Sequence, residues 1–199
     1  MCSDVINSKE NMAELSDETL YLRFLEEQDE ALFRELLLRH QNSLIYFLYG
    51  YVHSYEDAEE LMIDTFAIAA SGTTRFVPGR NAGFRTWLFA IAKNRARMYL
   101  RRHRPVFEPV PEEFPSGDPL PETHLVSREQ RSQLYGALNS LASDYRQVLY
   151  LLYFEGMKPE EIGSVMGKTI KQIYNLTNRG KAALRESLEK MGFEYAQFG

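Results

Sequence analysis

The sequence has one cysteine, Cys2, in 199 residues. A single thiol forms no internal disulfide and no Cys-x-x-Cys site, which disfavours a disulfide-framed or zinc-built domain and favours a reducing compartment. The four histidines also stand far apart, at His40, His53, His103 and His124. None of them lies at ligand spacing from an acidic residue. We therefore expect no metal and no cofactor.

The motifs of phosphate binding and of nucleophilic catalysis are missing as well. The chain has no Gly-x-Gly-x-x-Gly, no P-loop and no nucleophile elbow, so we expect no enzymatic activity. The longest apolar run, residues 44–52, is too short to cross a bilayer, and the first twenty residues are acidic. We expect neither export nor membrane insertion, and a cytoplasmic location.

Acidic residues are absent from residues 65–107, which hold nine bases. Residues 1–64, in contrast, hold 15 acids and four bases, so the net charge of −5 hides a strong segregation. A region of one charge sign concentrates a polyanion and speeds its encounter with the protein. The pattern predicts a polyanion-binding centre in the middle of the chain and a different role for its first third.

Proline is scarce outside one segment. Six of the eight prolines fall within residues 105–121, together with four acids and no base, which predicts an extended acidic linker over residues 105–126. The flanks lack alternating β-branched runs, so both are expected to be helical. We predict an all-α fold of two small domains, a helical bundle at 12–104 and a helix-turn-helix domain at 127–191.

Capping signals divide the first domain into four helices. Ser16 begins a helix that runs to about residue 27, and Asp29 or Glu30 begins a longer one. Ser54 and Asp57 have the spacing of a capping box, which begins a third helix. A fourth helix follows the Gly- and Pro-containing loop at 71–83. Its apolar face is expected to hold Phe84, Trp87, Leu88, Ile91 and Met98.

The other face of this fourth helix is basic, with Arg85, Lys93, Arg97, Arg101 and Arg104. A solvated helix usually mixes charge signs, whereas phosphate contacts favour one sign. Interleaved aromatic rings can stack unpaired bases for about 1–3 kcal/mol each, although we assign Trp87 to the core. A basic amphipathic helix can also lie on an anionic membrane, but here the bundle needs its apolar face. The pattern favours nucleic acid.

Residues 157–190 have the pattern of a helix-turn-helix. Pro159 suits a first helical position, Gly167 ends a short helix, and Thr169 with Gln172 forms a capping box for a long final helix. The residues expected to face inward on the final helix are Ile170, Ile173, Thr177, Leu184 and Leu188. Those expected to face out, where they can read base edges or grip phosphate, are Lys171, Gln172, Asn175, Asn178, Arg179 and Lys181.

The order of these segments resembles the extracytoplasmic-function (ECF) sigma factors of bacterial RNA polymerase. The similarity spans about residues 16–190 and rests on YEDAEELMIDTF, on FRTWLFAIAKNRARMYLRRHR, on the Pro-rich linker and on the helix-turn-helix, in the family's order. It implies a subunit that directs core polymerase to specific promoters and opens the strands. The implied partners are core RNA polymerase and promoter DNA, and an anti-sigma factor is a further candidate.

The resemblance also implies three sets of contact residues. Docking on the polymerase clamp helices is implied for Asp57, Glu60, Leu61, Asp64 and Phe66. Contacts with the minus-ten element are implied for Arg75, Arg80, Phe84, Trp87, Lys93, Asn94, Arg95, Arg97 and Arg101. Contacts with the minus-thirty-five element are implied for Lys168, Thr169, Lys171, Gln172, Asn175, Asn178 and Arg179. One departure is Ile63, which stands where the family's docking motif often has a polar residue.

A freestanding helix-turn-helix transcriptional regulator is the alternative interpretation. Such a protein needs a sensor domain, and the first half of the chain has the docking motif where a ligand-pocket signature is expected. The two classes differ in what they bind. A sigma factor binds core polymerase tightly and free promoter DNA poorly.

Overall fold

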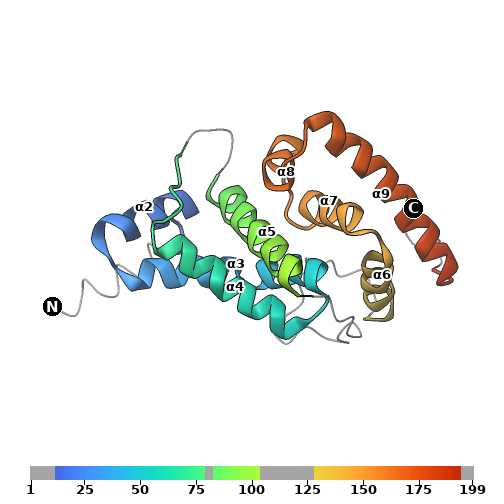
Figure 1. The fold of residues 1–199 in the computed structure, drawn as a ribbon, viewed down its shortest axis with the longest axis horizontal. Coiled ribbons are helices and arrows are strands. Elements are labelled where there is room, and N and C mark those ends of the chain that lie inside the picture. The colour runs from blue at the N-terminus through green and yellow to red at the C-terminus, as the bar shows by residue number, and fades with distance from the viewer. Residues whose placement is uncertain (1–11, 79–82, 104–127, 194–199) are drawn as a thin grey trace.

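The structure, a computed structural model, describes residues 12–78, 83–103 and 128–193. The described residues form eight helices and no strand (Figure 1), so the all-α prediction is confirmed for this part of the chain. The predicted linker at 105–126 lies outside the described residues, as do Arg80, Arg104 and Ser127.

The N-terminal unit consists of α2 (Asp17–Glu27), α3 (Glu30–Val52), α4 (Tyr55–Ala70) and α5 (Phe84–Arg102). The N-caps of the first three are the residues that the sequence predicted. Ser16 accepts a hydrogen bond from the N–H of Thr19, Asp29 from Ala31 and Ser54 from Asp57. Each cap therefore satisfies a backbone donor that a helix start leaves without an intrahelical partner.

The C-terminal unit consists of α6 (Arg128–Ser140), α7 (Ser143–Tyr153), α8 (Pro159–Met166) and α9 (Ile170–Lys190). Pro159 is the first residue of α8, and Gly167 ends that helix with a φ of 64°, a conformation that glycine adopts without strain. Thr169 and Gln172 form the predicted capping box at the start of α9. The helix-turn-helix is therefore built as the sequence indicated.

Two residues assigned to buried faces lie at the surface. Met98 on α5 and Ile170 on α9 are both exposed. Ile170 is the first residue of its helix, where neighbouring turns do not yet cover it. Met98 lies in the last turns of α5, beyond the part of that helix that carries its buried residues. Helical spacing predicts which face a residue occupies, but not how far the covering elements extend.

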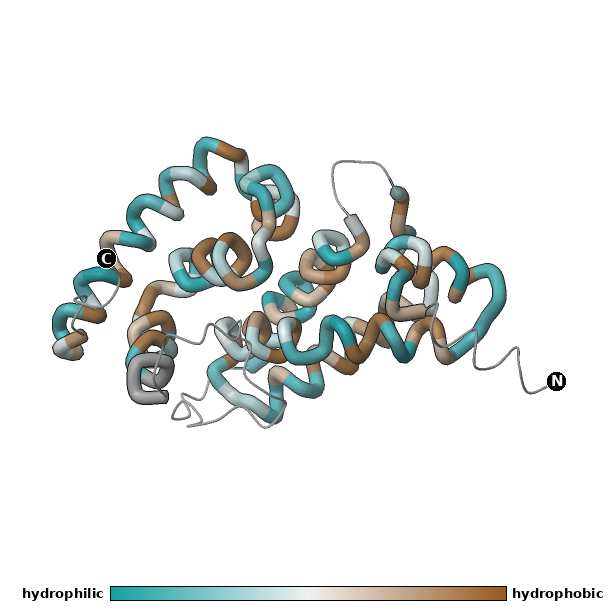
Figure 2. The backbone as a smooth tube through the Cα atoms, turned by 180° about the vertical axis from the view of Figure 1, so that it is seen from behind, coloured by the Kyte–Doolittle hydropathy of each residue, from teal (hydrophilic) through white to brown (hydrophobic). Residues whose placement is uncertain are grey.

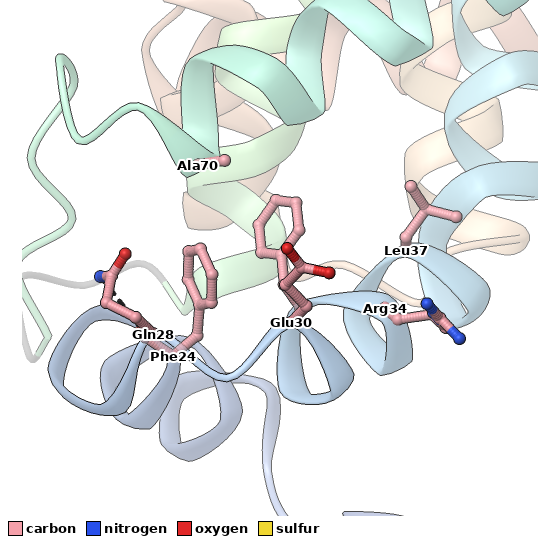
Figure 3. Close-up of a pocket in the computed structure, with 7 residues that line it drawn as sticks. Phe24, Gln28, Glu30, Arg34, Leu37 and Ala70 are labelled. Carbon is pink, nitrogen blue, oxygen red and sulfur yellow. Dashed lines mark hydrogen bonds between the residues drawn. The ribbon is translucent and has the colours of Figure 1, made fainter.

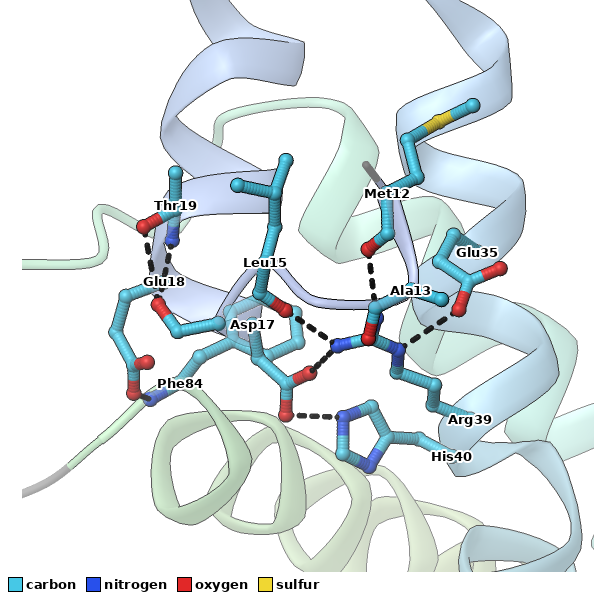
Figure 4. Close-up of polar contacts among 11 residues, drawn as sticks. Met12, Ala13, Leu15, Asp17, Glu18, Thr19, Glu35, Arg39, His40 and Phe84 are labelled. Atoms are coloured by element: carbon cyan, nitrogen blue, oxygen red, sulfur yellow. Dashed lines mark hydrogen bonds and ion pairs between the residues drawn. The ribbon is translucent and has the colours of Figure 1, made fainter. Parts of the chain in front are cut away.

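A polar cluster fastens α2 to α3 (Figure 4). The carboxylate of Asp17 accepts hydrogen bonds from Arg39, at 3.0 Å, and from His40, at 2.7 Å. Arg39 also donates to the backbone carbonyls of Met12, Ala13 and Leu15, just before α2. Burial alone would raise the pKa of Asp17, but these bonds and charges outweigh it and hold the pKa below its ordinary value.

The two units pack against each other along two helix pairs. In Figure 1, α5 lies between α4 and α8, and contacts also join α3 to α7. The buried apolar residues of both units form one continuous core cluster. Hydrophobic and hydrophilic residues alternate along the helices (Figure 2), as expected for helices that bury one face in this core. Within the described residues, no helix is long and apolar enough to cross a membrane.

Candidate nucleic-acid interface

The basic face of α5 is positioned by three neighbouring helices. Its N-terminus is fixed from α2, because the carboxylate of Glu18 accepts a hydrogen bond from the N–H of Phe84 at 2.9 Å (Figure 4). Its apolar face packs on α3 and α4. Toward its C-terminal end Asn94, Arg97 and Arg101 are exposed. These three predicted residues present a polar and basic surface with no acid on the same helix.

The aromatic residues at the start of α5 form a cluster and not an open surface. The Trp87 ring lies 5.2 Å from Tyr21 and 5.5 Å from both Phe76 and Phe84, measured between ring centroids. Phe84 is fully buried, so its side chain has no free face for a DNA base in this conformation. Trp87 is partly covered, as its assignment to the core anticipated. The exposed Arg75 lies in the preceding loop.

Two residues predicted to bind different partners contact each other. Arg95, expected at the DNA, forms an ion pair with Asp64, expected at the polymerase. Both side chains remain partly exposed. A second link joins the same helices, where Tyr99 on α5 interacts with the carboxylate of Asp57 on α4. Burial, and then this carboxylate, raises the pKa of Tyr99 to about 12. Helices α4 and α5 are therefore coupled through polar groups as well as through their core.

The five predicted docking residues of α4 do not share one face. Leu61 and Phe66 are each 3% exposed and belong to the core, so they stabilise the bundle and present no side chain to a partner. Glu60 is exposed, whereas Asp57 and Asp64 are half-buried. Ile63 is 62% exposed, which makes it one of the large apolar side chains at the surface. The accessible part of this helix therefore combines carboxylates with one exposed isoleucine.

Helix α9 presents the polar residues predicted to contact DNA on its outer side. Lys171, Gln172, Asn175, Asn178 and Arg179 are all exposed. A shallow hollow of about 190 Å³ is lined by Lys168, Gln172, Asn175, Leu176 and Arg179. The side-chain amide oxygen of Gln172 is occupied, because it accepts a hydrogen bond from the backbone N–H of Thr169 at 2.8 Å. Gln172 and Thr169 therefore serve the helix start in this structure.

One exposed aromatic of α9 had no place in the sequence prediction. Tyr174 is 55% exposed and lies between the predicted readers in sequence. Helical spacing alone marks it as outward-facing, since it immediately follows the buried Ile173. That spacing is the signal that marks Tyr174 as accessible, whereas its residue type is not one of the amides and cations that contact base edges and phosphates most often.

Residues predicted to contact DNA from the two units lie next to each other in the structure, which the sequence did not indicate. Lys93 of α5 donates to the carbonyl oxygen of Val165 on α8 at 3.0 Å. Burial, and then the positive charges of Arg97 and Lys168, lower the pKa of Lys93, while Asp144 opposes them. Lys168 forms an ion pair with that same Asp144 at 3.0 Å. Two predicted phosphate-binding lysines are therefore neighbours.

A separate pocket of about 570 Å³ lies at the other end of the bundle, where α2 and α3 approach the end of α4 (Figure 3). Its wall combines apolar side chains with Gln28, Glu30 and Arg34, and the apolar part consists of Phe24, Phe33, Leu37 and Ala70. No residue predicted to bind DNA or polymerase lines it. Within the described residues, no three potential metal-ligating side chains come together.

Two protein families match the chain, in the order of its two units. Residues 36–106 match the sigma-70 region 2 family, and residues 131–184 match the sigma-70 region 4 family. The ECF RNA polymerase sigma factor SigE of Mycolicibacterium smegmatis is 31% identical over 167 residues, covering 82% of this chain and 64% of that protein. This chain thus spans slightly less than two thirds of that relative.

A second relative is matched over nearly its whole length. The ECF RNA polymerase sigma-E factor of Salmonella typhimurium is 27% identical over 189 residues, covering 89% of this chain and 97% of that protein. Among solved structures, CnrH in complex with the cytosolic domain of CnrY has a TM-score of 0.63 at 24% identity, over 87% of this chain and 97% of that one. The sigma factor RpoE of Bartonella quintana, in complex with the anti-sigma factor NepR, has a TM-score of 0.61 at 23% identity, over 79% and 96%.

Proposed function

Because the chain belongs to the ECF group of the sigma-70 family, we propose that it is a promoter-specificity subunit of bacterial RNA polymerase. It recruits core polymerase to particular promoters and initiates transcription by recognising the minus-ten and minus-thirty-five elements and opening the strands. It contributes binding and no catalysis of its own, and it acts in the cytoplasm, where its template lies.

One observation carries the proposal. Two surfaces suited to DNA lie on separate helical units: the acid-free face of α5 and the outer side of α9. A single promoter offers two matching targets, a melted strand and a duplex. Arg97 and Arg101 suit the phosphates of a strand, while Asn175 and Arg179 suit the base edges of a major groove.

The polymerase-binding surface is assigned to the accessible side of α4. Glu60 and Ile63 are its exposed members, and the half-buried Asp57 and Asp64 lie along the same helix. An exposed carboxylate beside an exposed isoleucine suits a partner helix that offers both basic and apolar groups. Leu61 and Phe66 support this surface from below, because their side chains lie in the core.

An anti-sigma factor is proposed as a further partner. The structural neighbour RpoE is described as a complex with an anti-sigma factor. This chain shares its fold with that protein.

The proposal is tested by run-off transcription with bacterial core polymerase and a library of genomic fragments. Discrete transcripts that require both the chain and the core enzyme are expected. The freestanding regulator makes the opposite prediction: the chain alone shifts duplex promoter DNA and does not co-purify with core polymerase. Core enzyme alone is the control for transcription that needs no specificity subunit.

A further inference from the structure

The pocket between α2, α3 and the end of α4 has the size and the lining of a small-ligand site (Figure 3). Its volume is about 570 Å³, and pockets that hold small molecules measure about 300–1,000 Å³. Such sites combine a mainly apolar wall with a few polar groups that orient the ligand, and this wall has the same make-up. None of the residues assigned to DNA or to polymerase lines it. The pocket is therefore free for a separate role.

Two phenylalanine rings form an aromatic surface in the wall. The rings of Phe24 and Phe33 lie 4.6 Å apart between their centroids, with 32° between their planes. Phe33 is supported from α4, because the ring of Phe66 meets it edge-on at 5.8 Å. Leu37 and Ala70 complete the apolar wall. An aromatic or branched apolar group of a ligand can pack against this surface.

Two opposite charges line the same pocket without pairing with each other. Glu30 and Arg34 lie four residues apart on α3 with the carboxylate first, which is the favourable order for an ion pair along a helix. Glu35 and Arg39 have the same order and spacing, and they form an ion pair at 2.9 Å. Among the described residues, by contrast, no hydrogen bond or ion pair engages the side chain of Glu30 or that of Arg34 (Figure 3). The wall thus offers one free anion and one free cation.

Two acids beside Glu30 in the sequence already have partners. Glu27 forms an ion pair with Arg23 at 2.8 Å, and Asp29 accepts a backbone N–H at the start of α3. Gln28 lies between them, and its amide nitrogen donates to the carbonyl of the α2 residue Leu25 at 3.1 Å. The polar part of the pocket is therefore close to neutral, with one carboxylate, one guanidinium and one amide.

We propose that this pocket binds a free amino acid with an aromatic or branched apolar side chain. The side chain of the ligand packs on Phe24 and Phe33, its ammonium group meets Glu30, and its carboxylate meets Arg34. Charge-assisted hydrogen bonds are stronger than neutral ones, and a guanidinium can hold a carboxylate by two parallel bonds. A ligand with only one charge leaves one of the two wall groups unused.

The pocket is connected to the start of α5 through neighbouring rings. Between centroids, Phe24 lies 6.4 Å from Tyr21, and Tyr21 lies 5.2 Å from Trp87 and 5.0 Å from Phe84. A ligand packed on Phe24 therefore acts on the ring cluster at the start of α5. Trp87 is the single tryptophan of the chain, so its emission reports on that cluster.

Binding is measured by titration calorimetry on the full chain, with L-phenylalanine as the probe. For a ligand of this size a Kd of about 0.1–1 mM is expected. Hydrocinnamate has the same skeleton without the ammonium group, and phenethylamine has it without the carboxylate. Each analogue should bind the parent chain about three- to fivefold more weakly than L-phenylalanine, because each loses one contact at an exposed charge.

The variants remove one charge at a time from exposed positions, so the fold should be kept. Glu30→Gln should bind L-phenylalanine no more tightly than hydrocinnamate, and Arg34→Gln should bind it no more tightly than phenethylamine. The matched controls are Glu26→Gln and Arg102→Gln, two exposed residues that do not line the pocket, and both should keep the full preference of the parent. Ala70→Phe fills the pocket and should lose binding of all three probes.

Three results would each overturn the proposal: no saturable binding up to about 10 mM L-phenylalanine, equal affinity for the three probes, or binding that survives in Ala70→Phe. If Ala70→Phe loses helical circular dichroism, Ala70→Leu takes its place and the same outcomes apply. Saturating L-phenylalanine should also change the Trp87 emission of the parent chain, and an unchanged emission would remove the connection to α5. These measurements use neither polymerase nor DNA, so their outcome is independent of the proposed function.

Discussion

The guanidinium of Arg95 on α5 is paired with the carboxylate of Asp64 on α4, so a residue expected at the DNA is bonded to one expected at the polymerase. Substituting either residue therefore removes two things at once, a predicted partner contact and a link between two helices. Glu60 on α4 and Arg97 and Arg101 on α5 are exposed. They give cleaner tests of the two roles.

Neutralising the basic face of α5 should harm strand opening more than initial DNA binding. Opening costs lost base stacking, about 1.4 kcal/mol per step, and phosphate contacts to the separated strand offset that cost. We expect Arg97→Gln with Arg101→Gln to cripple transcription from fully paired promoters. A template with a mismatch bubble at minus ten should restore much of it, because the stacking has been lost in advance.

Arg95→Gln, measured in parallel, should also lower thermal stability, because it removes the ion pair with Asp64. For a partly exposed pair this is about 0.2–1 kcal/mol. If the Arg97 and Arg101 variant loses activity equally on paired and bubble templates, these arginines recruit DNA and do not support melting.

Truncating the exposed carboxylate of α4 should weaken the binding of core polymerase. We expect Glu60→Ala to cost about 2–5 kcal/mol if docking buries the charge against a basic partner. Ile63→Gln should cost about 1.5–3 kcal/mol through lost apolar burial. Affinity is measured by titrating labelled chain with core enzyme. Glu26→Ala, an exposed acid on α2 and away from the assigned surface, is the control, and an unchanged affinity of Glu60→Ala would remove α4 from the docking surface.

Asn175 and Lys171 should differ in what their loss does to promoter recognition. Asn175→Ala is expected to cost about 1–3 kcal/mol at one base position of the minus-thirty-five element. Lys171→Ala should weaken all sequences alike and reduce the salt slope by about 1. Binding of the chain in complex with core polymerase to a panel of promoters with single-base changes in the minus-thirty-five element distinguishes them, and a uniform loss for Asn175→Ala would show that it does not read bases.

Gln172 is predicted to behave differently from both. Its side chain accepts the N–H of Thr169 and so completes the capping box. Gln172→Ala should therefore lower the stability of the C-terminal unit by about 0.5–2 kcal/mol, with little change in base preference.

Asp17 should contribute stability at neutral pH that acid removes. Its pKa is held below the ordinary value of 3.8. A carboxylate with a lowered pKa stabilises the fold fully above that ordinary value, and the contribution is lost as the pH falls through the folded-state pKa. Asp17→Asn should cost about 1.5–3 kcal/mol at pH 7. The difference between variant and parent, followed by thermal melting, should shrink below about pH 3.8.

Glu35→Gln is the matched control, because Glu35 bonds the same Arg39 but lies one turn away on the same helix. It should cost about 0.3–0.5 kcal/mol. A gap between Asp17→Asn and the parent that does not shrink at all as the pH is lowered below 3.8 would mean that the carboxylate charge plays no part.

Local sequence signals were enough to predict where the helices lie and, for most of them, which face is buried. The caps at Ser16, Ser54 and Thr169 are side-chain bonds to backbone only a few residues away, so the sequence alone determined them. Leu61 and Phe66 belong to the buried face of α4, whose residues recur at helical spacing, so the sequence pattern could have placed both in the core; it was the resemblance that assigned them to a partner.

The contact between the two units could not be predicted from the sequence, for a different reason. Arg146 is a cation whose neighbours in sequence give no sign of burial, and its acceptor at Gly50 lies 96 residues away. Backbone carbonyls are offered by every residue, so no residue type marks the acceptor in advance. The exposed Tyr174, in contrast, was visible in the helical spacing and was missed only because its residue type was not expected there.

The carboxylate of Glu18, bound to the N–H of Phe84, also determines where a working fragment can begin. The family match starts at residue 36, inside α3, and so includes all of α5 but none of α2. A fragment cut at that boundary keeps every residue of α5 that is predicted to contact DNA. It loses the group that satisfies the first donor of that helix, and with it Tyr21, whose hydroxyl donates to the Ala69 carbonyl at the end of α4. The stretch that the family match covers is therefore shorter than the stretch that the fold requires.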